Sequence, residues 1–175
     1  LVARLIFTAV EFGATVIGYQ MGFAAAEIFD PQSERQVALV SQFQNVFAIM
    51  IFLAINGHHI FLRAVVLSYE LLPPGQVDVS GEAVPYLMRL ASHMFTIGVQ
   101  FSAPVLAVLL LSGLILGILA RVFPQLNVFL LSFPINIGAG LVVIALTLDL
   151  AANLIRREFD TLAERIFTLL TYLSP

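Results

Sequence analysis

Three histidines are the side chains in this sequence best suited to bind a metal or a haem. His58 and His59 are adjacent, and neighbouring residues on a helix point about 100° apart, so the two cannot face one metal ion. His93 has no partner at the H-E-x-x-H spacing that zinc enzymes use. We therefore predict no metal site and no cofactor.

The sequence does not support nucleophilic catalysis either. The chain has no cysteine, which excludes a thiol nucleophile, a thiolate metal site and a disulfide framework. The serines that lie in apolar runs are Ser102, Ser112 and Ser132, and none of them has a G-x-S-x-G context. Because no catalytic constellation appears, we predict that the protein is not an enzyme.

The elements that hold these side chains are strongly apolar. Of 175 residues, 60% are hydrophobic and 11% are charged, and the mean hydropathy is +1.00. Soluble domains have about 45–50% apolar and about 25% charged residues, so a soluble single domain is excluded. The formal net charge is -3, with only eight basic residues. No basic surface is available for phosphates, and nucleic-acid binding is excluded as well.

Four charge-free windows predict membrane-spanning helices, each of which needs about 20 apolar residues. The windows are 12–26, 36–62, 90–120 and 122–148. The third has 31 residues, roughly 46 Å of helix, and we expect it to bend at Pro104 because a proline removes a helical hydrogen bond. The predicted fold class is all-α: an integral membrane-type helical bundle of about four long kinked hairpin helices plus a C-terminal amphipathic helix.

Turn formers and charges divide the chain into four segments. Leu71 to Pro85 combines Pro73-Pro74-Gly75 with acidic residues, which is typical of a surface loop. Asn153 to Leu173 interleaves charged with apolar residues at helical spacing, which predicts a peripheral amphipathic helix. The predicted segments are a first helical hairpin at 1–70, a polar loop at 71–85, a second, broken hairpin at 86–152 and the amphipathic helix at 153–175.

Small residues at four-residue spacing predict close helix packing in two places. The sets are Ala14, Gly18, Gly22 and Ala26 in the first segment, and Gly113 with Gly117 in the third span. Such stripes let the backbones of membrane helices approach one another. We expect both sets to be contacts between subunits.

A polar turn follows the first segment, and its polarity continues into the second span. Asp30-Pro31-Gln32 ends the first helix. Within the second window lie the polar residues Ser41, Gln42, Gln44 and Asn45. Polar side chains inside a span indicate a polar neighbour or a water-filled cavity. A short solvated hairpin with interhelical hydrogen bonds is the other interpretation, and the residues leave both open.

Two prolines shape the turn between the third and fourth spans. Pro124 ends one helix, Asn127 can cap the next, and Pro134 releases the carbonyl of Leu130 one turn in. Together with Gln125, these residues are expected to set the geometry of the C-terminal hairpin. The alternative is that Pro134 is a tolerated kink in a lipid-facing helix.

The motif Arg121-x-x-Pro124-Gln125-x-Asn127-x-Phe129, followed by Phe133-Pro134, resembles the FliR family of flagellar biosynthetic proteins and its type III secretion export-gate (SctT-like) counterparts. The resemblance covers the whole chain. Members of the family are longer at the N-terminus, and we expect this chain, which begins at an apolar Leu1, to be a truncated form. Where many members have a lysine two residues after the second proline, this sequence has Asn136.

The resemblance implies a structural subunit of the protein export gate, without enzymatic activity of its own. One such chain joins FliP-like and FliQ-like membrane subunits, with an FlhB-like subunit nearby, around a conduit for unfolded export substrates. The location implied is the bacterial inner membrane, within the flagellar basal body or an injectisome. By position, the family's pore plug falls between Gly22 and Gln44. The gate residues assigned in this way are Phe23, Phe29, Asp30, Pro31, Gln32 and Gln42.

A polytopic secondary transporter or an ion channel subunit is the alternative function. These proteins also contain broken helices and carboxylates at membrane depth, such as Glu11 here. Many transporters have an internal repeat that relates their two halves, and the sequence shows none. The export-gate interpretation is therefore preferred.

Overall fold

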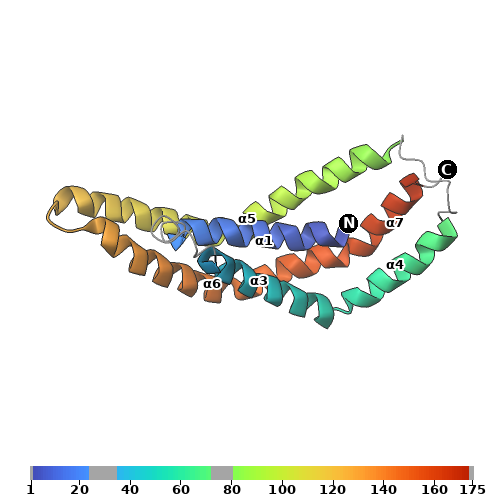
Figure 1. Ribbon diagram of the computed structural model, residues 1–175, viewed down its shortest axis with the longest axis horizontal. Coiled ribbons are helices and arrows are strands. Elements are labelled where there is room, and N and C mark those ends of the chain that lie inside the picture. The colour runs from blue at the N-terminus through green and yellow to red at the C-terminus, as the bar shows by residue number, and fades with distance from the viewer. Residues whose placement is uncertain (1, 24–34, 72–80, 174–175) are drawn as a thin grey trace.

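The computed structural model describes residues 2–23, 35–71 and 81–173, and the regular structure in these ranges is entirely α-helical. The helices are α1 (Val2–Gln20), α3 (Arg35–Ala54), α4 (Gly57–Leu71), α5 (Ala83–Val122), α6 (Val128–Asp160) and α7 (Leu162–Leu173). They form an elongated bundle in which α5 and α6 make a hairpin that extends beyond the other helices (Figure 1). The predicted all-α class is confirmed.

Three of the described helical stretches are long and apolar enough to cross a membrane: α1, α5 and the run from α6 through α7. The pair α3 and α4 would make a fourth span, but the two helices are bent by 71° at the break between them. The expected window 36–62 is therefore not one continuous helix. Asn56 lies in the break with a φ of 58°, a left-handed conformation that asparagine tolerates better than most residues and that cannot continue a helix.

The long helix α5 is continuous through Pro104 and changes direction near its middle, where the colour passes from green to yellow (Figure 1). A proline removes one hydrogen bond and clashes with the carbonyl four residues earlier, which bends the helix without ending it. The bend lets the first half of α5 lie near α7 while the second half pairs with α6.

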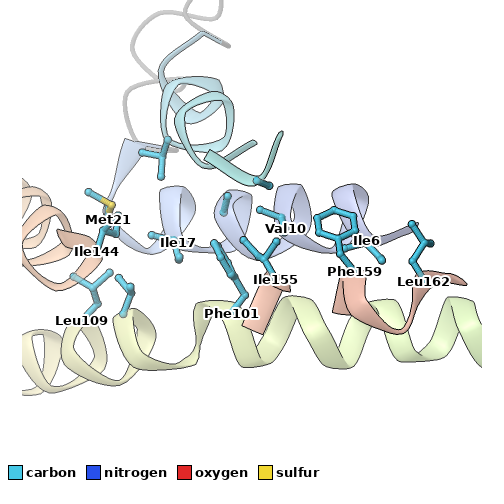
Figure 2. Packing of buried hydrophobic residues seen from close by; sticks show 14 of the residues in the cluster. Ile6, Val10, Ile17, Met21, Phe101, Leu109, Ile144, Ile155, Phe159 and Leu162 are labelled. Carbon is cyan, nitrogen blue, oxygen red and sulfur yellow. The ribbon is translucent and has the colours of Figure 1, made fainter. Parts of the chain in front are cut away.

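Helix α1 lies at the centre of the bundle and packs along α5 and α3. Figure 2 shows Ile6, Val10 and Ile17 of α1 facing side chains of α5 and α6. Phe159 of α6 is fully buried, and its ring lies against those of Phe7 and Phe52 at centroid distances of 5.2 and 5.0 Å. α1 thus joins four other helices, α3, α5, α6 and α7, into a single apolar core.

The amphipathic C-terminal stretch is divided between two helices. α6 continues past Asn153 to Asp160, and Thr161 separates it from α7. α7 buries Leu162 and Leu170 and leaves Glu164 exposed, as an amphipathic helix does. The division of the chain at residues 70, 85 and 152 remains a prediction about its organisation.

Candidate assembly surface

The distal half of the α5–α6 hairpin exposes apolar side chains on many sides. We call this set the hairpin surface. Its larger members are Leu110, Leu111, Leu114, Ile115, Ile118, Val122, Phe123, Leu126, Phe129, Leu130, Leu131, Ile135, Leu141, Val142 and Leu146. Leu146 is 78% exposed. A contiguous apolar surface of this kind marks contact with lipid or with another protein.

Gly113 and Gly117 lie within the hairpin surface. A Cβ atom built at either glycine, or at Gly138 of α6, meets nothing within 4 Å. Within the residues that the structure describes, the chain therefore does not pack against these glycines. They leave shallow places on the surface where a partner helix can approach closely, and their predicted role as subunit contacts stays a prediction.

The turn between α5 and α6 contains the predicted Asn127 cap, and the role of Pro124, Gln125 and Pro134 in setting the hairpin geometry stays a prediction. α5 ends at Val122, and Pro124 and Gln125 follow it, both exposed. Asn127 is the N-cap of α6, and its side-chain oxygen accepts a hydrogen bond from the backbone N–H of Leu130 at 3.3 Å. This cap satisfies one of the donors that every helix start leaves open.

Pro134 is exposed on α6, which continues through it without a break. Two residues after Pro134, Asn136 accepts at its Oδ1 a hydrogen bond from the hydroxyl of Ser112 at 2.8 Å. This bond joins α5 to α6 within an apolar surrounding. A polar residue inside a span indicates a polar neighbour, but no spacing rule pairs Ser112 with Asn136.

The small-residue stripe of α1 faces the chain's own helices along part of its length. Ala14 is 0% exposed and belongs to the apolar core, and Gly18 is buried too. Gly22 has a φ of 96°, and a Cβ there would lie 3.1 Å from the ring of Phe133. Ala26 lies outside the described residues. Ala14 and Gly22 therefore contact other helices of the same chain, and a contact with another subunit remains a prediction.

The closest helix crossing that the structure describes lies between α1 and α5. A Cβ at Gly13 would stand 2.6 Å from the carbonyl oxygen of Gly98, and a Cβ at Gly98 would stand 2.9 Å from that of Ala9. Only glycine fits at both positions without moving the backbones apart. This pair was not predicted, although Ala9 stands four residues before Gly13 and Ser102 four residues after Gly98, which is the spacing of small residues that permits close packing.

The polar run of α3 lies partly against α1. The hydroxyls of Ser41 and Thr15 are 3.1 Å apart, and Gln44 is only 4% exposed. Among the predicted gate residues, Phe23 is half-buried against the apolar core, whereas Gln42 is exposed. The others, Phe29, Asp30, Pro31 and Gln32, lie outside the described residues.

Comparison with known protein families places this helical hairpin in context. Residues 1–162 match the model of the family described as bacterial export proteins, family 1. The chain belongs to this family.

Several curated members of the family are similar to the chain. The flagellar biosynthetic protein FliR of Bacillus subtilis (strain 168) is 33% identical over 173 residues, covering 97% of this chain and 67% of that protein. The FliR of Pectobacterium carotovorum subsp. carotovorum is 34% identical over 175 residues, covering 98% of the chain and 66% of the relative. The FliR of Escherichia coli (strain K12) is 30% identical over 164 residues, covering 91% and 63%. The chain thus spans about two thirds of the length of these relatives.

One further cluster, made of ionisable side chains, lies outside the set of predicted site residues. His93 of α5, Glu158 of α6 and Arg165 of α7 meet through their side chains. Glu158 and Arg165 lie 65 and 72 positions after His93 along the chain. No local spacing rule connects residues at such separations, so the sequence alone could not have grouped them.

Proposed function

We propose that this chain is a structural subunit of the flagellar or type III protein export gate, and that it forms part of the conduit for unfolded export substrates. The match to the bacterial export proteins supports the link to export. The geometry of the α5–α6 hairpin supports a role in assembly, and it is the observation that carries this part of the proposal.

The hairpin is longer than a bilayer is thick. α5 has 40 residues, about 60 Å of helix, whereas the hydrocarbon core of a membrane measures about 30 Å. Exposed apolar side chains extend along α5 from Val84 to Val122. A bilayer covers only about half of such a length unless the helix is strongly tilted. The remaining apolar surface needs protein neighbours, because exposed apolar patches of this size are unfavourable in water.

The partners proposed are FliP-like and FliQ-like membrane subunits, with an FlhB-like subunit beside them. Open glycines at positions 113 and 117 allow their helices to approach the backbone of α5. The assembly lies in the bacterial inner membrane, within the flagellar basal body or an injectisome. The chain contributes surface and not catalysis, so it has no enzymatic activity of its own.

The closed state of the conduit is proposed to depend on the segment between Gly22 and Gln44. The partly polar packing of α3 against α1 supports this assignment, because Thr15, Ser41 and Gln44 bring polar groups into an otherwise apolar contact. Such polar groups in a membrane protein commonly lie beside a water-filled path. The transporter or channel alternative is disfavoured by the membership of the export family.

The proposal is tested by purification of the protein from its own cells. An affinity tag is added to the chromosomal gene, the membrane fraction is extracted in mild detergent, and the co-purified proteins are identified by mass spectrometry. We expect at least two further export membrane proteins in one large complex. The variant Gly117→Leu should lose them, while Gly81→Leu, at an exposed position outside the hairpin, should keep them. Recovery of the wild-type protein as a lone monomer would contradict the proposal.

A further inference from the structure

One face of α1 is polar over most of its length, although the helix as a whole is apolar enough to span a membrane. Exposed on this face are Arg4, Glu11 and Tyr19, and half-buried between them are Thr8 and Thr15. At about 100° per residue, the five positions fall within an arc of about 80° around the helix. None of the aliphatic or phenylalanine side chains of α1 falls within this arc. We call these five residues the polar face.

The rest of the surface of α1 is covered by the chain's own helices. α1 lies between α5 and α3 and packs along both (Figure 1), and its large apolar side chains point into the core (Figure 2). On the side of α3, the hydroxyls of Thr15 and Ser41 are 3.1 Å apart. On the side of α5, the rings of Phe12 and Phe95 meet at 5.5 Å. The polar face is the strip of α1 that remains between these two neighbours.

Glu11 lies at the middle of the span. It is nine positions from Val2 and nine from Gln20, about 14 Å from either end of the helix, which is further than a glutamate side chain extends. The ion pairs of the described residues join Glu158 to His93 and Arg165, and none includes Glu11 or Arg4. A carboxylate without a counter-ion at this depth is strongly unfavourable in lipid. The polar face therefore needs a polar environment.

The hairpin surface shows the opposite composition. Its exposed side chains are large and apolar, as Leu146 is, and lipid or apolar helices can cover them without loss. A partner helix could cover the polar face only if it brought a matching charge to Arg4 and another to Glu11, two turns further along α1. Water satisfies both charges and all the hydroxyls at once. The chain thus presents one surface suited to apolar neighbours and a second surface suited to water.

We propose that the polar face of α1 lines the water-filled path of the conduit, and that Glu11 attracts cationic groups to this path. The proposal rests on the proposed function of the chain as part of the conduit. α1 ends at Gln20, two residues before Gly22, where the segment assigned to the closed state begins. Hydroxyl groups along the path offer hydrogen bonds to an unfolded chain and little apolar surface for it to adhere to, and the carboxylate favours positively charged segments.

The proposal is tested by the reactivity of single cysteines with charged, membrane-impermeant methanethiosulfonate reagents. The chain has no cysteine of its own, and Thr8→Cys and Thr15→Cys change the size of the polar-face side chains little. Leu146→Cys on the hairpin surface is the matched control, because that side chain is more exposed than either threonine. Membrane vesicles from the protein's own cells are opened to the reagents on both sides by freezing and thawing. Unmodified cysteines of the tagged chain are then detected by the gel shift that a polyethylene glycol maleimide causes.

We expect Thr8→Cys and Thr15→Cys to react, and Leu146→Cys to remain unmodified over the same time. Glu11 lies one helical turn from Thr15, about 6 Å away, where a unit charge in water changes the local concentration of a monovalent ion about threefold. Glu11→Gln in the Thr15→Cys background should therefore lower the ratio of the cationic to the anionic reaction rate about tenfold at low ionic strength. The ratio cancels any effect of Glu11 on the cysteine itself.

Three results would overturn the proposal: unreactive cysteines at both threonine positions, equal reactivity of Leu146→Cys, or an unchanged rate ratio in Glu11→Gln. The assembly of each variant with other export membrane proteins is measured separately by co-purification. An assembled complex with an unreactive polar face would contradict the proposed lining of the path and leave the proposed function intact. A chain recovered as a lone monomer would contradict the proposed function, whatever the reactivity of the polar face.

Discussion

The crossing of α1 and α5 provides a quantitative test of the fold, because one helix contains both packed and open glycines. Replacing Gly98 by alanine places a Cβ atom 2.9 Å from the carbonyl oxygen of Ala9 and 2.6 Å from the ring of Phe12. The ring can rotate, but the carbonyl belongs to the backbone of α1. To reach ordinary van der Waals contact at 3.4 Å, the two helices must separate by about 0.5 Å at this point.

The cost of this separation can be isolated with a second substitution in α5. Overpacking of a well-packed contact costs about 1–3 kcal/mol. Gly117→Ala adds the same methyl group where nothing lies within 4 Å. Both variants gain the same helix propensity, about 0.5–1 kcal/mol relative to glycine. The difference between their free energies of unfolding therefore measures the overpacking alone.

We expect Gly98→Ala to be less stable than Gly117→Ala by about 1–3 kcal/mol. The assay is reversible unfolding of the purified protein in mixed micelles with increasing dodecyl sulfate, followed by circular dichroism. Gly117→Ala should be at least as stable as the wild type. Equal stability of the two alanine variants, within about 0.5 kcal/mol, would refute the close crossing that the structure describes.

Three further predictions concern the hairpin and the polar turn. Asn127→Leu removes the cap of α6 and should lower the free energy of unfolding by about 0.5–2 kcal/mol in the same assay. Asn127→Ser, which can still cap the helix, should retain most of the wild-type free energy of unfolding. Ser112→Ala and Asn136→Leu, combined in a double-mutant cycle, should show a coupling energy of about 0.6 kcal/mol, and additive effects would exclude the hydrogen bond. A partial deletion within residues 29–36 should leave the complex assembled but make the membrane leak ions in conductance measurements, and an unchanged conductance would remove this segment from the gate.

Features that depend on local sequence could be predicted, and features that depend on distant pairs could not. Asn127 was expected to cap a helix because a capping side chain acts on an N–H only three residues away. Pro104 lies within the predicted long helix, because a single proline bends an apolar helix more easily than it ends it. The break at Asn56 was missed because the apolar pattern continues across it, although the dipeptide Asn56-Gly57 is a turn signal in the sequence.

The packing partners of the small residues were the least predictable. Gly98 is followed four residues later by Ser102 and not by a second glycine, yet it lies in the tightest described crossing, while Gly113 and Gly117, which form a G-x-x-x-G pair, face open space. Spacing indicates that a helix can be approached closely, but it does not say whether the approaching helix comes from the same chain. The cluster of His93, Glu158 and Arg165 depends on the folded arrangement of three helices and has no signal in local sequence.

The central claim is that protein subunits, and not lipid alone, cover the hairpin surface. Photo-crosslinking in living cells tests it most directly, with a light-activated amino acid placed at Ile118, which is 56% exposed. If subunits cover this surface, illumination joins the chain to a second membrane protein of the export apparatus, identified by mass spectrometry, and the adduct disappears when Gly117→Leu is added. An Ile118 probe that reacts only with lipid, in cells that export normally, would show that lipid alone covers the hairpin surface.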